Sequence, residues 1–152
     1  MLQTGDLVDD FELPDQTGAV RRLSTMLADG PVVLFFYPAA MTKGCTMESC
    51  HFRDLAAEFA AAGAQRVGIS GDTVDTQKEF SDAHEFDYPL LADTEGTVAE
   101  LFGVKRSFGI SPLKRATFVI DRDRTVLAAI KSEIRMNVHA DKALEVLRAA
   151  AA

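Results

Sequence analysis

The chain is 152 residues long, with 47% hydrophobic and 26% charged residues and a formal net charge of -7 at pH 7. These proportions are typical of a soluble globular protein and exclude disordered and collagen-like chains. A chain of this length is expected to form one domain, residues 1–152, that buries about two thirds of the surface exposed by its unfolded form. The negative charge opposes binding to nucleic acids and to anionic membrane surfaces, so neither partner is expected.

The N-terminal residues predict a cytoplasmic location. Met1 to Asp6 lack the basic region and apolar run of a secretory signal, and the longest apolar run, Val32 to Tyr37, is too short to cross a bilayer. The cytoplasm is reducing, and a hydrophobic core of this size is stable without a structural disulfide bond. The two cysteines, Cys45 and Cys50, therefore need a chemical rather than a structural explanation.

The first elements expected along the chain are a hairpin and a buried strand. Turn residues from Pro14 to Gly18 separate Phe11–Leu13 from Ala19–Leu23, which predicts a small N-terminal β-hairpin. Val32 to Tyr37 is too apolar for a strand with one wet face, so we expect a buried central strand there.

One helix is expected to follow the central strand, between Thr46 and Ala62. Apolar residues recur there at helical spacing, namely Phe52, Leu55, Phe59 and Ala62. Gly63 supplies the C-terminal stop, because glycine readily adopts the left-handed conformation that ends many helices.

The rest of the chain continues to alternate strands and helices. Strands are expected at Arg66–Ser70 and Tyr88–Leu91 and, as a hairpin around the turn Asp121–Arg124, at Ala116–Ile120 and Thr125–Ile130. Helices are expected at Asp72–Glu85, at Gly96–Phe102 before Gly103, and at His139–Arg148. Their inward residues are expected to include Phe80, Ala83, Ala140, Leu144 and Leu147. This alternation is typical of an α/β sheet protein.

Cys45 lies between the expected central strand and its helix, where open α/β folds place their sites. A thiol acts as a nucleophile in its thiolate form, and an ordinary cysteine with a pKa of about 8.5 is only about 3% thiolate at pH 7. Lowering that pKa to about 6 requires about 3.4 kcal/mol, whereas a helix N-terminus supplies about 2 kcal/mol at most. A guanidinium is the natural supplement, since it stays charged and donates two hydrogen bonds from one fork.

The residues around Cys45 resemble those of the peroxiredoxins, and within them the peroxiredoxin Q or bacterioferritin comigratory protein group. Pro38, Thr42 and Cys45 match the family motif Pro-x-x-x-Thr-x-x-Cys, and the segment from Cys45 to Asp54 is similar to that group's peroxidatic and resolving cysteine segment. Arg115 to Asp121 is similar to the family segment in which an arginine begins a strand and reaches the active site.

The resemblance covers nearly the whole chain and implies a thioredoxin-like α/β fold, with a central mixed β-sheet flanked by helices and an N-terminal β-hairpin. It also implies roles for particular residues: Cys45 as peroxidatic nucleophile, Thr42 as a hydrogen-bond partner of the substrate oxygen, Pro38 as a shield of the sulfur, Arg115 as the group that polarises peroxide, Glu48 as the group that orients the arginine, and Cys50 as the resolving cysteine. Lys43 departs from the family pattern, which commonly has proline there; lysine loosens the loop backbone and adds a cation near Cys45.

The reaction implied by the resemblance is the reduction of hydrogen peroxide or organic hydroperoxides. The Cys45 sulfenic acid would condense with Cys50 into an intramolecular disulfide, which thioredoxin or a similar dithiol protein would reopen. No metal and no organic cofactor is implied. A monomer or a weak homodimer is expected.

Simpler interpretations exist for most of these residues when each is taken alone. Thr42 could be a helix-capping or loop hydroxyl, Arg115 a solvated charge, and Glu48 a carboxylate favoured electrostatically by the first turn of a helix. His51 follows Cys50 and suggests a metal ligand, but the second ligand pair of a structural zinc site is missing. His84 and His139 fall at expected helix ends, where capping or solvation explains them.

Two other functions remain open on the same fold. A disulfide oxidoreductase usually carries Cys-x-x-Cys, which the chain lacks. A redox-sensing binding protein would use its disulfide to alter a partner surface, to which Phe108, Ile110 and Leu113 could contribute. These three residues could equally pack internally or form a homodimer contact.

Overall fold

The computed structural model describes residues 1–106 and 112–151. Its centre is a mixed five-stranded sheet in the order β5-β4-β3-β6-β7. The strands are β3 (Val32–Phe36), β4 (Gln65–Ser70), β5 (Leu90–Ala92), β6 (Ala116–Ile120) and β7 (Val126–Lys131). β3 pairs in parallel with β4 and antiparallel with β6. The prediction of a buried central strand is confirmed, because β3 is the middle strand and all its residues are buried.

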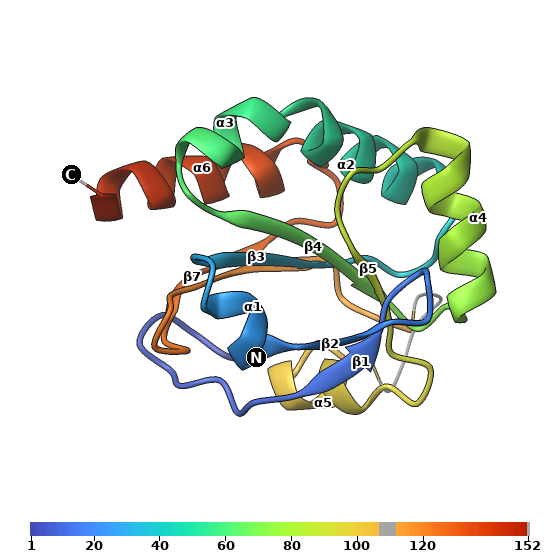
Figure 1. The fold of residues 1–152 in the computed structure, drawn as a ribbon, viewed down its shortest axis with the longest axis horizontal. Coiled ribbons are helices and arrows are strands. Elements are labelled where there is room, and N and C mark those ends of the chain that lie inside the picture. The colour runs from blue at the N-terminus through green and yellow to red at the C-terminus, as the bar shows by residue number, and fades with distance from the viewer. Residues whose placement is uncertain (107–111, 152) are drawn as a thin grey trace.

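Helices cover both faces of this sheet. The helices are α1 (Leu23–Leu27), α2 (Lys43–Asp54), α3 (Ala56–Ala61), α4 (Val74–His84), α5 (Thr97–Phe102) and α6 (Val138–Ala151). Figure 1 shows α2, α3, α4 and α6 on one face, with α1, α5 and the N-terminal hairpin on the other. That hairpin, β1 (Glu12–Pro14) with β2 (Val20–Arg22), is antiparallel as predicted. No helix within the described residues combines the length and apolar character needed to cross a bilayer.

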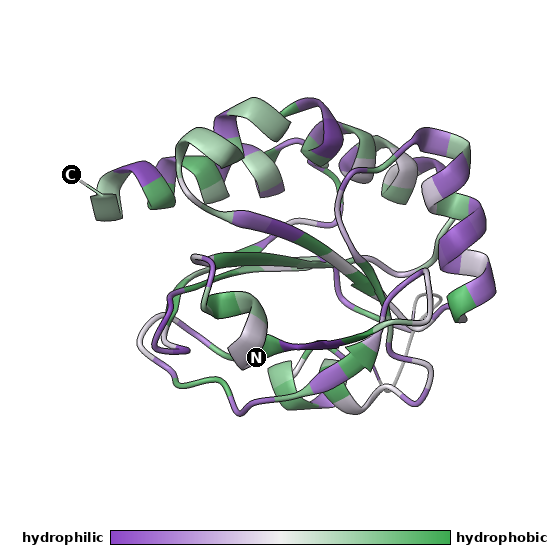
Figure 2. Ribbon diagram, viewed as in Figure 1, coloured by the Kyte–Doolittle hydropathy of each residue, from purple (hydrophilic) through white to green (hydrophobic). Residues whose placement is uncertain are grey.

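The side chains of β3 divide between two hydrophobic cores. Val33 and Phe35 face the core under α2 and α3, where Phe35 stacks on Phe52 with ring centroids 4.1 Å apart. Leu34 and Phe36 face the opposite core, under α1 and α5. Burying each such side chain contributes about 1.5–3 kcal/mol. β3, green along its length in Figure 2, is therefore firmly anchored at the point where the chain leaves it for the loop before Cys45.

The single helix expected from Thr46 to Ala62 is wrong, because the segment forms α2 and α3 with a break at Leu55 (φ -96°, ψ 22°). Arg66 of β4 donates from Nη1 to the carbonyl oxygens of Phe52 (3.0 Å) and Arg53 (3.5 Å). These carbonyls thereby find a partner outside their own helix, a tertiary contact that the apolar spacing does not reveal. α2 also starts earlier than expected, at Lys43, so Cys45 lies inside its first turn.

Smaller differences concern burial and element ends. Ala83 is exposed rather than inward, because α4 packs on the sheet through Phe80 and Gln77. The strand expected at Tyr88–Leu91 is β5, Leu90–Ala92, because the pairing with β4 begins at Leu90. Tyr88 lies before the strand, and its hydroxyl donates to the Ser49 carbonyl. α1 was not predicted. Of the residues considered for a partner surface, Leu113 is buried in the core, and Phe108 and Ile110 lie outside the described residues.

Candidate active site

A short loop connects β3 to α2 and sets the start of the helix. The Ala40 N–H donates to Asp72 Oδ2 (2.8 Å), and Met41 adopts a left-handed conformation with φ 68°. Thr42 is the N-cap residue; its carbonyl accepts from Thr46 N–H, while its hydroxyl donates to the Ala39 carbonyl (2.7 Å) rather than capping the helix. These contacts hold the loop so that the helix begins directly before Cys45.

Cys45 is the third residue of α2 and is 1% exposed. Backbone N–H groups in the first turn of a helix lack intrahelical partners and present positive potential, which favours an anionic sulfur. The Sγ atom accepts a hydrogen bond from Arg115 Nη2 at 3.3 Å. The predicted combination of a helix N-terminus with a guanidinium is therefore present around this sulfur.

Arg115 lies directly before β6 and is 6% exposed. Its Nη1 donates to Glu48 Oε1 at 2.8 Å while Nη2 donates to Cys45, so one planar group bridges the carboxyl and the sulfur. Burial opposes the charged form, but Glu48 and Cys45 outweigh it and raise the pKa of Arg115 above its ordinary value. The guanidinium is therefore a permanent positive charge in the site.

Gly44 allows this close approach of Arg115. A Cβ atom at Gly44 would lie 3.3 Å from Arg115 Nη2, which is tighter than ordinary contact, and 3.4 Å from Met136 Cε, at the lower limit of ordinary contact. The absence of a side chain at this position therefore leaves space for the guanidinium beside the start of α2.

Glu48 is fully buried and lies in the second turn of α2. The explanation by first-turn electrostatics is therefore wrong, because α2 begins at Lys43 and has no acidic residue in its first turn. Burial raises the pKa of Glu48 to about 8, against the opposing effect of Arg115. Its Oε2 atom has no hydrogen-bond partner among the residues that the structure describes.

His139 is a member of this cluster that the sequence reasoning missed. It was expected to cap a helix or be solvated, but it is fully buried. Its Nδ1 lies 2.8 Å from Thr117 Oγ1 and 3.6 Å from Glu48 Oε2, and its Nε2 lies 2.8 Å from the Ser132 carbonyl. A signal was available: His139 stands four and eight residues before Ala143 and Leu147, on the buried stripe of α6.

The other predicted site residues lie around this buried centre. Pro38 is half-buried between β3 and α2, and Thr42 is exposed at the start of the helix. Cys50 is on α2 with Cys45, both as free thiols, and burial raises the pKa of Cys50. The structure thus brings Cys45, Glu48 and Arg115 into direct contact, with Pro38 and Thr42 in the adjoining loop and Cys50 farther along the helix.

His51, considered as a metal ligand, instead faces α6. Its Nε2 lies 2.8 Å from Asp141 Oδ1. In the described ranges, 1–106 and 112–151, no group of three or more His, Cys, Asp or Glu side chains is placed to hold a metal ion. His84 is half-buried and its ring stacks on Phe86.

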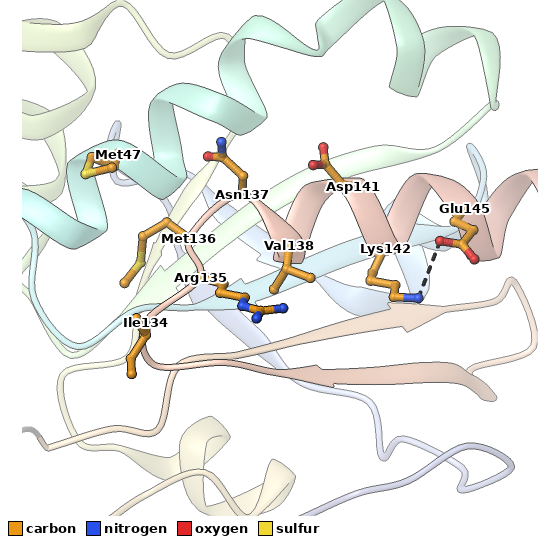
Figure 3. A pocket seen from close by; sticks show the side chains of 9 residues that line it. All are labelled: Met47, Ile134, Arg135, Met136, Asn137, Val138, Asp141, Lys142 and Glu145. Atoms are coloured by element: carbon orange, nitrogen blue, oxygen red, sulfur yellow. Dashed lines mark ion pairs between the residues drawn. The ribbon is translucent and has the colours of Figure 1, made fainter.

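A cavity of about 420 Å³ lies between α2 and α6, beside the site. Figure 3 shows its lining side chains, with Met47 on α2 and the others on the segment before α6 and on α6 itself: Ile134, Arg135, Met136, Asn137, Val138, Asp141, Lys142 and Glu145. Neither Cys45 nor Arg115 lines it.

Glu48→Gln is expected to remove a pH dependence of stability. Because the folded-state pKa of Glu48 is about 8, above the ordinary 4.5, its protonated form stabilises the fold. This contribution is complete below about pH 4.5 and is lost as pH rises through about 8. Urea unfolding should show the wild type losing on the order of a few kcal/mol relative to Glu48→Gln between these limits.

Glu79→Gln, at an exposed position on α4, is the matched control and should follow the wild type at every pH. If the stability difference between the wild type and Glu48→Gln does not change with pH, the pKa of Glu48 is not raised in the folded protein.

Comparison with known proteins finds relatives that match this chain over nearly its whole length. The model of the AhpC/TSA family matches residues 4–129. A putative peroxiredoxin of Mycobacterium tuberculosis is 65% identical over 150 residues, covering 97% of each chain. Chloroplastic peroxiredoxin Q of Gentiana triflora is 37% identical over 147 residues, covering 96% of this chain and 67% of the relative.

Solved structures agree with these relatives. The crystal structure of peroxidoxin BcpB from Mycobacterium tuberculosis has a TM-score of 0.94 at 64% identity and covers 98% of each chain. Bacterioferritin comigratory protein of Xanthomonas campestris has a TM-score of 0.86 at 28% identity, covering 97% of this chain and 100% of that one. The expected thioredoxin-like fold is confirmed. The chain belongs to the AhpC/TSA family and, within it, to the peroxiredoxins of the peroxiredoxin Q or bacterioferritin comigratory protein group.

Proposed function

We propose that the chain is a thiol peroxidase that reduces hydrogen peroxide and organic hydroperoxides through Cys45, with Cys50 as resolving cysteine and thioredoxin or a similar dithiol protein as reductant. The observation that carries the proposal is the 3.3 Å contact between Arg115 Nη2 and Cys45 Sγ at the buried start of α2. This guanidinium balances an anionic sulfur and keeps donors directed at the place where a peroxide oxygen would meet it.

The reaction uses the thiols of Cys45 and Cys50 and an external dithiol. The Cys45 thiolate attacks one peroxide oxygen, the O–O bond breaks, and the other oxygen leaves with a proton as water or an alcohol. Cys45 is then a sulfenic acid, and attack by the Cys50 sulfur releases water and forms the disulfide. An external dithiol reduces the disulfide by exchange and is itself oxidised. Alkyl peroxide reduction activity is described for the Xanthomonas campestris relative, which supports organic hydroperoxides as substrates.

The disulfide requires α2 to open. Both cysteines lie on this continuous helix, five residues apart. In an ideal helix that spacing gives about 7.5 Å of rise and about 140° of rotation, so the two Cα atoms are about 8.6 Å apart. A disulfide needs about 4.4–6.8 Å. The intact helix therefore cannot close the bond, and at least its first turn or two must unwind.

Oxidation is expected to increase amide hydrogen exchange between Cys45 and Phe52 while β3 stays protected. The helix loses backbone hydrogen bonds when it opens, whereas β3 is paired on both sides and buried on both faces. Exchange measured by mass spectrometry on reduced and peroxide-treated protein checks this. Cys50→Ser treated in the same way controls for oxidation without the bond. Unchanged exchange in protein shown to contain the Cys45–Cys50 disulfide would contradict the unwinding of α2.

A peroxide-consumption assay coupled to thioredoxin, thioredoxin reductase and NADPH tests the function as a whole, with the state of both cysteines followed by mass spectrometry. The proposal expects sustained NADPH oxidation that depends on both peroxide and thioredoxin. Exchange with disulfide substrates without peroxide turnover would indicate a disulfide oxidoreductase. A single stoichiometric oxidation by peroxide, with no turnover when any of several dithiol proteins is supplied as reductant, would indicate a redox-sensing protein instead.

A further inference from the structure

The loop before Cys45 contains a residue whose backbone conformation its own side chain does not explain. Met41 has φ 68°, in the left-handed region, which non-glycine residues avoid because Cβ crowds the carbonyl oxygen. Its side chain is 52% exposed, so side-chain packing does not hold the backbone in place. Relaxation at Met41 would shift the start of α2, which carries Cys45. The contacts on either side of Met41 therefore impose its conformation.

Asp72 supplies the contact on the amino-terminal side. The buried Ala40 donates its N–H to Asp72 Oδ2 at 2.8 Å. Asp72 follows the end of β4, so this hydrogen bond ties the loop to a neighbouring strand. On the carboxyl-terminal side, the Thr42 hydroxyl donates to the Ala39 carbonyl, a contact within the loop itself. Asp72 thereby links the loop to the strand beside β3.

A buried hydrogen-bond network fixes Asp72 in turn. The Ser70 hydroxyl donates to Asp72 Oδ2, and Ser70 Oγ accepts from the Gln77 side-chain amide at 2.9 Å. The same amide donates to the Leu91 carbonyl at 2.9 Å, and Gln77 Oε1 accepts from the Tyr37 hydroxyl. Ser70, Gln77 and Tyr37 are fully buried. Because buried polar groups without partners are costly, this satisfied network favours one arrangement.

The network holds the active-site segment from the side opposite to the guanidinium. Its members come from the ends of β3 and β4, from β5 and from α4. β4 and β6 flank β3 on opposite sides. Asp72 reaches the loop from the end of β4, and Arg115 reaches Cys45 from the start of β6. Accurate placement of the sulfur against Arg115 therefore depends on both neighbouring strands.

We propose that Asp72 is a positioning residue for the peroxide step. By accepting the Ala40 N–H, it keeps Met41 in the left-handed conformation. The start of α2 then stays where Cys45 meets Arg115. This inference rests on the proposed peroxidase function and refines it. Asp72 takes no part in the chemistry, and its negative charge by itself would disfavour a thiolate at Cys45, so its contribution is geometric.

Substitutions at Asp72 separate the shape of the side chain from its charge. Asp72→Asn keeps an oxygen that accepts from Ala40 and Ser70, so its rate with hydrogen peroxide should stay within about threefold of the wild type. Asp72→Ala removes that oxygen and should react about tenfold more slowly, equal to about 1.4 kcal/mol. Asp75→Ala removes an exposed carboxylate from the first turn of α4 and is the matched control, which should react like the wild type.

The pH dependence of the peroxide rate gives a readout that a merely structural role would not move. Loss of the Asp72 charge alone would move the midpoint of this dependence to lower pH, because a thiolate would form more readily. A displaced Cys45 instead loses the hydrogen bond from Arg115, which moves the midpoint to higher pH. We expect Asp72→Ala to show the shift to higher pH and Asp72→Asn not to show it.

Glycine at position 41 provides a test by rescue. Glycine adopts φ 68° without the crowding of a Cβ atom, so the loop then depends less on Asp72. Asp72→Ala should therefore lose about tenfold in rate in the wild-type background but less than about threefold in the Met41→Gly background. Equal losses in the two backgrounds would mean that Asp72 does not act through Met41.

The rate is that of prereduced protein with hydrogen peroxide, measured by competition with a chromogenic peroxidase because the chain contains no tryptophan to report it. Circular dichroism and thermal unfolding establish that each variant is folded. Ser70→Ala removes one of the hydrogen bonds to Asp72 Oδ2 and should slow the same step about threefold. It replaces Asp72→Ala in these comparisons if that variant does not fold.

The outcomes distinguish this role from the function on which it rests. An active wild type whose rate is unchanged by Asp72→Ala, or by Ser70→Ala where that variant replaces it, overturns the role of Asp72 alone. An equal loss in Asp72→Asn, a pH midpoint that stays or moves lower, or equal losses in both backgrounds at position 41 overturns it too. A wild type that does not react with peroxide overturns the proposed function together with this refinement of it.

Discussion

Cys45→Ser is expected to lose the fast reaction with peroxide, by about 10³-fold or more, whereas Cys50→Ser keeps a first turnover. The reason is the different setting of the two sulfurs. Cys45 accepts the Arg115 hydrogen bond in the first turn of α2. Cys50 is partly buried farther along the same helix, and burial raises its pKa, which disfavours its thiolate. Cys45 is therefore the sulfur expected to attack a peroxide oxygen.

The measurement is single-turnover kinetics on prereduced variants, with the products identified by mass spectrometry. Cys50→Ser should accumulate the sulfenic acid of Cys45 or its more oxidised forms, because no second thiol condenses with it. Each cysteine variant serves as the control for the other, since both remove one sulfur from the same helix. Equal loss of the first turnover in both variants would reject the assigned roles.

Arg115→Lys is expected to slow the peroxide step by about 10²-fold despite keeping the positive charge. In the wild type, Nη1 holds Glu48 Oε1 at 2.8 Å while Nη2 reaches Cys45 Sγ at 3.3 Å. An ammonium group is a compact point charge on a flexible stem, so it cannot present this planar fork to both partners and to a peroxide oxygen. The rate of the peroxide step should therefore fall even though the charge at this position is unchanged.

Single-turnover kinetics with hydrogen peroxide check this prediction. Arg122→Lys, an exposed arginine in the turn between β6 and β7, is the matched control and should react like the wild type. If Arg115→Lys reacted at the wild-type rate, a positive charge alone would be sufficient for the peroxide step. Two-pronged hydrogen bonding by the guanidinium would then be wrong as its explanation.

The sequence by itself determined the features that depend on neighbouring residues. The apolar run ending at Tyr37 specifies a strand buried on both faces, because a strand exposed on one face would alternate polar residues. The same holds for the hairpin of β6 and β7, where turn residues and apolar residues lie within one segment. The family motif likewise named Cys45 and Arg115 from short segments.

The tertiary structure alone decided which distant groups meet. Arg115 is 70 residues from Cys45 and 67 from Glu48, and they touch because β6 pairs beside β3, whose end leads into α2. The same sheet order brings Arg66 to the carbonyls at the end of α2, which divides the expected helix, and places His139 of α6 against Thr117 of β6. Local periodicity reports which face of an element is buried, but the partner on the other side depends on strand order and helix packing. The contacts of His139 with Thr117 and with the Ser132 carbonyl therefore follow only from the assembled fold.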